Sequence, residues 1–303
     1  MAFETERVHL PAAVASHAAR RSVLFRESLP ALAERWALGL AWGLMPNRIG
    51  GIPGLAKLCF DEALSPDYAL PDPERTLEKP PGLAGIVHEL DLPTLLSAYR
   101  RGLYPLAHVP PLKWWSPPER SVLLFDDTHI AHKQRKLMRQ GRYTVTFDRD
   151  FEQVIAACAA RRPGRWHLTW ITPRIMRVYA EAFDAGHAHS FEVWNKAGEL
   201  VAGGYGLGIG AAFTSESQFF REPNTSKIGM TVLNWHLAHW GYRFNDGKLM
   251  NPLLQTLGFR DMPRRAFLAK LDAATKAPGK PGRWQVEADL DTVSRWDPKA
   301  DQP

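Results

Sequence analysis

The stretch SFEVWNKAGELVAGGYGLGIGAAFTSES, residues 190–217, contains three apolar segments separated by short polar or glycine-containing connections. Residues 190–194, 200–207 and 211–215 are bounded by turn-forming residues and carry Val, Phe, Tyr and Leu, which predicts strands. Because the connections are short, we expect the three strands to run antiparallel to one another. These residues therefore predict the centre of a β-sheet.

The glycine run within this stretch, residues 203–210, superficially resembles a dinucleotide-binding loop. Such a loop joins a strand to a helix, whereas this run lies between two predicted strands. Glycines in that position are typical of bulges and tight hairpin turns. We therefore interpret the run as part of the sheet rather than as a phosphate-binding site.

Helix and strand patterns continue on both sides of this stretch. Downstream, residues 227–240 predict a long helix and 242–246 another strand. Residues 104–118 are broken by prolines and predict a loop. Upstream, the pattern predicts strands over 121–125 and 143–147 and helices over 92–103, 129–140, 151–160 and 173–185. This order is typical of an α+β, acyltransferase-like fold in which a mixed sheet is flanked by helices.

Residues 1–81 form an extension in front of this fold. Leu29, Leu32, Trp36 and Leu40 recur at helical spacing, which predicts an amphipathic helix. An apolar stripe of this kind packs on a neighbouring domain more often than it lies on a membrane surface, so we favour packing. The proline-rich residues 61–82 predict an extended linker.

The composition is that of a globular protein, with 45% hydrophobic and 23% charged residues. Cys59 and Cys158 are the only cysteines, which excludes a disulfide scaffold, an all-cysteine zinc site and a CxxC redox motif. Cysteine use this sparse favours the reducing cytoplasm. The formal net charge is +6, and residues 1–80 carry 9 Lys/Arg against 10 Asp/Glu. The positive excess therefore lies in the rest of the chain and suggests a polyanionic partner.

Two further patterns are candidate ligand sites. Residues 129–142 hold five basic residues and no acidic one: Lys133, Arg135, Lys136, Arg139 and Arg142. On a helix most of these can reach phosphate, and a solvated basic helix is the alternative. His187 and His189 lie two apart on a predicted strand, and without a third ligand nearby they favour structural hydrogen bonds over a metal.

Seven short motifs, in order along the chain, resemble those of the bacterial leucyl/phenylalanyl-tRNA–protein transferases. They are AYRRGLYP at 98–105, WWSP at 114–117 with Arg120, TWIT at 169–172, GHAHSFEVW at 186–194, FTSES at 213–217, NTSK at 224–227, and LG at 257–258 before PRR at 263–265. The resemblance covers residues 82–272 and leaves the extension outside it.

The resemblance implies a domain order and a reaction. After the helical extension 1–81, it implies a small α/β domain over 82–146, an acetyltransferase-like (GNAT-type) catalytic domain over 147–275 and a C-terminal tail over 276–303. The implied reaction moves Leu, Phe or Met from its tRNA to the N-terminal Arg or Lys of an acceptor protein, which marks the acceptor for degradation. No metal or organic cofactor is implied, and we expect a cytoplasmic monomer with no role for a membrane surface.

The resemblance also implies which residues form the site. Glu216 matches the family's site glutamate and is assigned to the acceptor's amine or basic side chain, and Asp246 matches its site aspartate. For the tRNA 3′ end the stacking candidates are Tyr99, Trp115 and Trp170, with core packing as the alternative for each. The remaining expected substrate contacts are Phe213, Ser217 and Gln218.

The sequence departs from the family pattern at four places. The family has glutamine where this chain has Lys248, tryptophan where it has Leu106 and methionine where it has Gln218. The usual Gly-Gly-Asp before the first helix is here His88-Glu89-Leu90-Asp91. Because Lys248 stands where the family has its site glutamine, we include it with Asp246 and Glu216 among the expected catalytic residues.

Lys248 is two residues after Asp246 on an extended segment, so both side chains should point to the same side. We expect the Lys248 ammonium to pair with the Asp246 carboxylate. That carboxylate would then be unavailable to a cationic acceptor, which would bind more weakly. The alternative is a lysine that swings into solvent on its flexible stem.

The chemistry agrees with these residues, because an aminoacyl ester is already activated and a free α-amine has a pKa of about 7.7–8.0. The enzyme then mainly positions its partners and needs no covalent nucleophile. Two other functions stay open. One is an acyl-coenzyme A-dependent acyltransferase of the same fold, although residues 221–227 lack the usual pyrophosphate-binding run. The other is a catalytically inactive tRNA-binding homologue.

Overall fold

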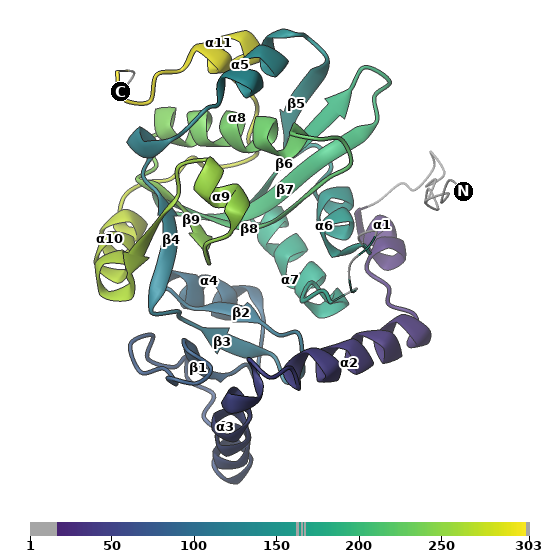
Figure 1. Ribbon diagram of the computed structural model, residues 1–303, viewed down its shortest axis with the longest axis vertical. Coiled ribbons are helices and arrows are strands. Elements are labelled where there is room, and N and C mark those ends of the chain that lie inside the picture. The colour runs from purple at the N-terminus through teal and green to yellow at the C-terminus, as the bar shows by residue number, and fades with distance from the viewer. Residues whose placement is uncertain (1–16, 162–163, 165, 167, 301–303) are drawn as a thin grey trace.

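A seven-stranded sheet lies at the centre of the protein (Figure 1). The computed structural model describes residues 17–161, 164, 166 and 168–300. The strand order is β10-β4-β9-β8-β7-β6-β5, and neighbouring strands are antiparallel except for the parallel pair β8–β9. The strands are β4 (Glu119–Leu123), β5 (Tyr143–Phe147), β6 (Ala188–Asn195), β7 (Leu200–Ile209), β8 (Ala212–Phe220), β9 (Phe244–Lys248) and β10 (Arg260–Pro263).

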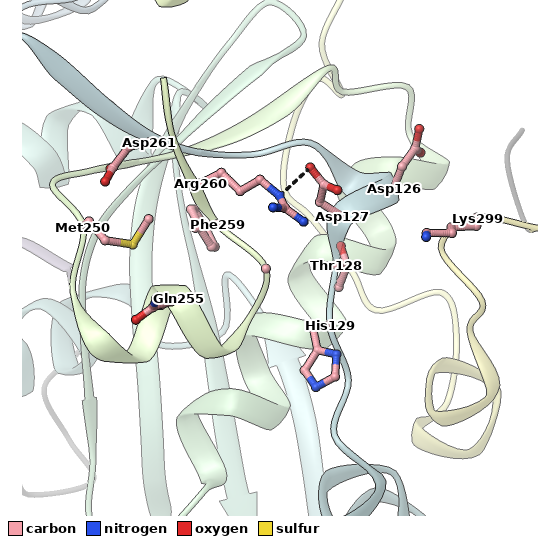
Figure 2. Close-up of a pocket in the computed structure, with 11 residues that line it drawn as sticks. Asp126, Asp127, Thr128, His129, Met250, Gln255, Phe259, Arg260, Asp261 and Lys299 are labelled. Carbon is pink, nitrogen blue, oxygen red and sulfur yellow. Dashed lines mark ion pairs between the residues drawn. The ribbon is translucent and has the colours of Figure 1, made fainter. Parts of the chain in front are cut away.

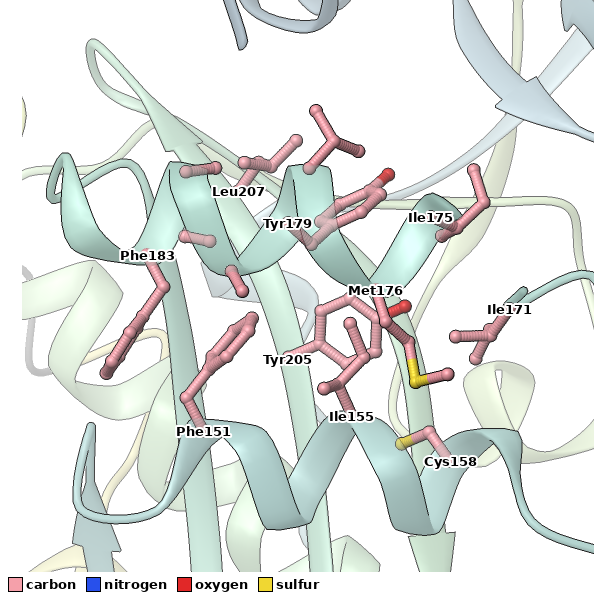
Figure 3. Packing of buried hydrophobic residues seen from close by; sticks show 14 of the residues in the cluster. Phe151, Ile155, Cys158, Ile171, Ile175, Met176, Tyr179, Phe183, Tyr205 and Leu207 are labelled. Carbon is pink, nitrogen blue, oxygen red and sulfur yellow. The ribbon is translucent and has the colours of Figure 1, made fainter. Parts of the chain in front are cut away.

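Helices cover both faces of this sheet (Figure 1). On one face, α6 (Phe151–Ala159) and α7 (Pro173–Asp184) pack on β6 and β7, and α4 (Leu92–Arg100) packs on α7. Figure 3 shows Phe151 and Ile155 of α6 facing Tyr179 and Phe183 of α7, with Tyr205 of β7 between the helices. The opposite face is covered by α8 (Thr225–His239), with α5 (His132–Arg139) and α11 (Leu290–Arg295) outside it. The remaining helices of this part are α9 (Pro252–Thr256) and α10 (Arg264–Lys276). The predicted α+β fold, a mixed sheet flanked by helices, is confirmed.

Local signals explain where the helices begin. Asp91 caps α4, because its carboxylate accepts a hydrogen bond from the backbone N of Thr94 at 2.8 Å. Thr172 caps α7 in the same way, and Pro173 occupies the first turn, where no backbone donor is needed. The glycine run also belongs to the sheet as expected, with a bulge at Tyr205 and Gly206.

A second sheet of three strands, in the order β1-β3-β2, lies below the larger sheet in Figure 1. Its strands are β1 (Leu83–Ile86), β2 (Tyr104–Leu106) and β3 (Lys113–Trp115). The prediction of a loop over 104–118 is therefore wrong. β2 and β3 have three residues each, too few for an alternating pattern, and β3 pairs with the distant β1. The predicted small domain, 82–146, contains strands of both sheets, since β4 and β5 belong to the larger one.

The C-terminal segment, predicted as a tail, packs into the core as far as Trp296, which is 3% exposed. Trp284 stacks on His189 with ring centroids 3.6 Å apart, and its backbone N donates to Asp148 Oδ2 at 2.8 Å. His189 Nδ1 lies 2.8 Å from the same carboxylate oxygen, which supports its structural interpretation. Among the described residues, no group of three or more His, Cys, Asp or Glu side chains is arranged to hold a metal ion.

The extension contacts both parts of the protein. On α1 (His17–Leu24), Arg21 forms ion pairs with Glu152 at 3.0 Å and Asp184 at 2.5 Å. Phe25, which follows α1, is 1% exposed within the core around α6 and α7.

The predicted amphipathic helix is α2 (Leu29–Gly43), followed by the 3₁₀ turn η1 (Ile49–Gly51) and α3 (Ile52–Leu64). Trp42 meets the ring of His108 edge-on at 4.8 Å, and a Cβ at Gly39 would come within 2.6 Å of the His108 carbonyl oxygen. The helix thus packs through Gly39 and Trp42, which lie outside the predicted apolar stripe. The expected packing of the stripe is wrong, because Leu29, Trp36 and Leu40 are 80%, 49% and 55% exposed. In the part of the chain that the structure describes, no helix is both long enough and apolar enough to cross a bilayer.

A buried carboxylate joins β6 to the start of α6. Glu192 is 0% exposed and accepts hydrogen bonds from the hydroxyls of Ser190 and Thr146, both at 2.6 Å. Burial raises the pKa of Glu192 to about 7, while these hydroxyl donors act in the opposite direction. The folded protein therefore holds a proton on Glu192 at pH values where the unfolded chain has already released it.

We expect Phe25→Ala to lower the free energy of unfolding by about 3–5 kcal/mol, because it removes a fully buried ring. Phe60, 64% exposed on α3, is the matched control, and Phe60→Ala should change stability by less than about 0.5 kcal/mol. Urea unfolding followed by tryptophan fluorescence measures both. Equal, small effects would mean that α1 does not belong to the cooperative unit.

We also expect stability to fall as pH rises from the ordinary carboxyl pKa of 4.5 through about 7, because the unfolded chain ionises Glu192 first. Glu192→Gln should remove on the order of 3 kcal/mol of this decline. Urea unfolding at several pH values within that window measures it. Glu181→Gln, at an exposed position on α7, should keep the wild-type pH dependence. Parallel curves for wild type and Glu192→Gln would contradict the expectation.

Candidate active site

The predicted catalytic residues lie on the two parallel strands β8 and β9. Thr214 of β8 is directly opposite Asp246 of β9. The β7–β8 register pairs Tyr205 with Ser217 and Gly206 with Ser215, which leaves Glu216 as the extra residue of a bulge. Bulges redirect a side chain, and this one places the Glu216 carboxylate against Tyr99 of α4.

Asp246 is fully hydrogen-bonded. Its two carboxylate oxygens accept Arg120 Nε at 2.8 Å and Arg120 Nη2 at 2.7 Å, a bidentate ion pair between side chains only 1–2% exposed. The same carboxylate accepts the Thr214 hydroxyl at 3.2 Å and the backbone N of Lys248 at 2.8 Å. Its charge is therefore balanced inside the protein, and its position is fixed.

Glu216 has a different set of partners. Its carboxylate accepts the Tyr99 hydroxyl at 2.6 Å and Lys248 Nζ at 2.7 Å, and the Tyr99 and Tyr179 hydroxyl oxygens are 2.6 Å apart. Burial, with the nearby Glu216 charge, raises the pKa of Tyr99 well above its ordinary value, so Tyr99 stays protonated and donates.

Lys248 does not pair with Asp246, so that expectation is wrong. Arg120 occupies Asp246, and the backbone of Lys248 has a positive φ of 64°, which breaks the simple alternation of an extended strand. The ammonium instead pairs with Glu216, and the side chain is 8% exposed. The alternative of a lysine free in solvent is also wrong.

Two aromatic rings flank the Lys248 ammonium: Trp170 at 4.9 Å and Tyr104 at 5.2 Å from the ring centroids. Of the predicted stacking residues, Tyr99 and Trp170 thus lie at this centre. Trp115 is half-buried and donates its indole N–H to the Leu106 carbonyl at 2.9 Å, which ties β3 to β2.

The remaining predicted substrate contacts are dispersed along β8. Phe213 is 1% exposed and packs near Trp284 on the α8 side of the sheet, so the structure places it in the core instead. Ser217 and Gln218 are half-buried and lie opposite Tyr205 and Gly204 of β7.

Sequence reasoning assigned no role to Arg120, Tyr104 or Tyr179, which complete this centre. Arg120 and Tyr104 both stand within quoted family motifs, and that was the signal available in the sequence. Tyr179 follows the ordinary apolar spacing of α7, and nothing in that pattern distinguishes it from a core residue.

The basic segment folds largely as α5, with Gln134 and Met138 facing inward. Arg135 donates to the carbonyl oxygens of Ser294 at 2.6 Å and Trp296 at 2.9 Å, so it holds the end of α11. The other four predicted tRNA-binding residues are exposed: Lys133, Lys136, Arg139 and Arg142.

A surface hollow of about 610 Å³ lies between α9, β10 and the loop after β4 (Figure 2). Its lining includes Asp126, His129 and Lys299, and Arg260 pairs with Asp127 across it at 3.3 Å. None of the predicted site residues lines this hollow.

Comparison with known proteins assigns the family. A family model described as leucyl/phenylalanyl-tRNA protein transferase matches residues 122–272, and the model of its N-terminal domain matches residues 88–118. A leucyl/phenylalanyl-tRNA–protein transferase of Alkalilimnicola ehrlichii is 36% identical over 231 residues, covering 76% of this chain and 89% of the relative. This chain belongs to the leucyl/phenylalanyl-tRNA–protein transferase family.

A second transferase, from Pseudomonas syringae pv. syringae, is 43% identical over 198 residues, covering 65% of this chain and 86% of the relative. The family models begin at residue 88, so the extension lies outside both of them. The solved structure of L-PGS from Bacillus licheniformis aligns with a TM-score of 0.31 and 13% identity over 66% of each chain, too weak a likeness to bear on this transferase.

If α5 contacts tRNA phosphates, replacing Lys133, Lys136 and Arg139 together by Gln should weaken tRNA binding and flatten its salt dependence. Each lost phosphate contact should lower the slope of log K against log salt by roughly 0.7–0.9. Filter binding at several salt concentrations measures the slope.

The matched control for this experiment removes three exposed lysines elsewhere, Lys196, Lys270 and Lys276, and should keep the wild-type slope. Arg135 is left in place because it holds α11. Equal slopes for the two triple variants would contradict a phosphate-binding role for α5.

Proposed function

We propose that this chain is an aminoacyl-tRNA–protein transferase that moves Leu, Phe or another amino acid from its tRNA to the N-terminal amine of an acceptor protein and so marks it for degradation. The membership of the family supports this function. The observation that carries it is the buried cluster of Tyr99, Glu216, Lys248, Arg120 and Asp246. Three distant segments that carry family motifs meet there with the strand that holds the site aspartate.

The reaction needs no covalent enzyme intermediate. The acceptor's neutral α-amine attacks the ester carbonyl carbon, a C–N bond forms, and the C–O bond to the tRNA ribose breaks. The amine loses a proton and the ribose oxygen gains one, so the products are an amide and a free hydroxyl. Because the free α-amine has a pKa of about 7.7–8.0, much of it is neutral near neutral pH. Positioning is then the main task of the protein.

The proposed roles follow from the contacts. Trp170, which is partly buried beside the Lys248 ammonium, supplies an aromatic face on which the terminal adenine can stack. Tyr104 is 2% exposed and lies under the Arg120 guanidinium, so it supports the wall of the centre. Lys248 is held beside the Trp170 ring by Glu216, and we assign it to the side of the centre that the acceptor approaches. Asp246 positions Lys248, because its carboxylate accepts a hydrogen bond from the backbone N of Lys248.

The acetyltransferase type of the fold is part of this proposal. It is supported by the parallel pair β8–β9, which α8 connects across one face of the sheet. We further propose a cytoplasmic monomer that binds aminoacyl-tRNA and an acceptor N-terminus and works without a metal or organic cofactor.

The test is incubation of the full chain with tRNA pools charged with isotope-labelled amino acids and with peptides of varied N-terminal residue. Mass spectrometry should find the peptide heavier by one labelled residue. Deacylated tRNA and acyl-coenzyme A serve as alternative donors. Transfer from acyl-coenzyme A alone would replace the proposed function, and tRNA binding without transfer would indicate an inactive homologue.

In the same assay, we expect Tyr99→Phe to lower kcat/KM by about tenfold or more, because Glu216 loses a buried charged hydrogen bond. Tyr143 is the matched control, since its hydroxyl also donates to a glutamate, Glu222, at 2.6 Å. It lies on β5, an edge strand three positions away from β8 in the sheet. Equal rates for Tyr99→Phe and Tyr143→Phe would remove Tyr99 from the site.

A further inference from the structure

The candidate centre contains two acids and two bases that neutralise one another in pairs. Arg120 and Asp246 form one pair at 2.7 Å, and Lys248 and Glu216 form the other, also at 2.7 Å. Side-chain exposure is 2% and 1% in the first pair, and 8% and 0% in the second. Each carboxylate at this centre thus already has a cationic partner.

The charge of Lys248 is fixed in place by its surroundings. Glu216 accepts one hydrogen bond from the ammonium, which lies 4.9 Å from the Trp170 ring centroid and 5.2 Å from the Tyr104 ring centroid. The backbone N of Lys248 is bound to Asp246. Of the three N–H donors of the ammonium, one is used on Glu216, and both rings lie within cation–π range of the same charge.

We propose, on the basis of the function proposed above, that the Lys248–Glu216 pair selects acceptors whose N-terminal residue is neutral or acidic and disfavours N-terminal Arg and Lys. A guanidinium or ammonium entering the centre meets the fixed charge of Lys248, and no carboxylate is left to balance it. Two like charges about 4–6 Å apart repel each other, so binding of a cationic acceptor residue is weakened. An acidic side chain can instead accept a hydrogen bond from the Lys248 ammonium.

The experiment uses the full chain, the charged tRNA found active above and four peptides that differ only in an N-terminal Arg, Lys, Met or Glu. The wild-type protein should show kcat/KM for the Met and Glu peptides about tenfold or more above that for the Arg and Lys peptides. This ranking tests the proposal without any variant.

Variants then assign the selection to the pair. Lys248→Gln should raise kcat/KM for the Arg and Lys peptides by about tenfold, or 1.4 kcal/mol, because Glu216 becomes available to a cationic acceptor. Lys248→Arg keeps the cation and should keep the wild-type ranking. The double variant Glu216→Gln/Lys248→Gln removes both charges and should lose the gain of the single variant.

The outcomes separate the two proposals. Efficient labelling of the Arg and Lys peptides by the wild type, with no gain in Lys248→Gln, overturns the acceptor selection and leaves the transferase function standing. A gain that the double variant retains also overturns it, because the gain would then not depend on the Glu216 charge. Failure to label any of the four peptides from any charged tRNA overturns the function itself, and the selection with it.

Discussion

The bidentate ion pair between Arg120 and Asp246 joins the parts of this protein that the chemistry requires to be together. It links β4 to β9, and the third nitrogen of Arg120 donates to the Gly102 carbonyl at 3.0 Å, at the end of α4. The guanidinium also lies over the rings of Tyr104 and Phe267, at 4.8 and 4.5 Å. Both sheets, α4 and α10 thus meet at one side chain. Loss of either partner would leave an uncompensated charge at a site only 1–2% exposed, which is among the most costly changes a fold can suffer.

Because Arg120 is bound to Asp246, the two site carboxylates, Asp246 and Glu216, have different roles. Asp246 accepts hydrogen bonds from donors that are fixed in the protein, and it holds the strands in place. Glu216 is held by the Tyr99 hydroxyl and the Lys248 ammonium, and that ammonium lies beside the Trp170 ring. The bulge on β8 creates the difference, since it turns Glu216 to the α4 side. A one-residue irregularity in strand pairing therefore decides which carboxylate faces the substrate side of the centre.

The sequence was informative wherever the relevant physics was local. The strand over 143–147 has the predicted bounds, and the Asp91 cap fixes the start of α4, because alternation and capping act within a few residues. Motif resemblance brought Glu216 and Asp246 into one site. The pairing of Lys248 could not be predicted in this way. It depends on a positive φ, on a bulge in another strand, and on Arg120, 126 residues from Asp246 in the chain, having taken that carboxylate.

Arg135 and Phe213 were predicted to contact a ligand, and both instead contact other parts of the protein. Each belongs to a residue type suited to ligand contact, yet Arg135 binds the carbonyls at the end of α11, and Phe213 packs near Trp284. Both partners come from the C-terminal segment, whose own pattern gave no indication that it would return to the sheet.

The N-terminal extension, at the other end of the chain, also contacts segments near the site. α2 reaches the loop between β2 and β3 through Trp42 and His108, and its Glu34 pairs with Arg161 in the segment leading to Trp170. α1 meanwhile holds the start of α6 and the end of α7 through Arg20 and Arg21. The loop between β2 and β3 follows the strand that carries Tyr104, and Arg161 precedes Trp170 in the chain. Both rings lie near the Lys248 ammonium. A segment outside the family match is therefore in contact with chain segments that adjoin Tyr104 and Trp170, the two rings beside the site lysine.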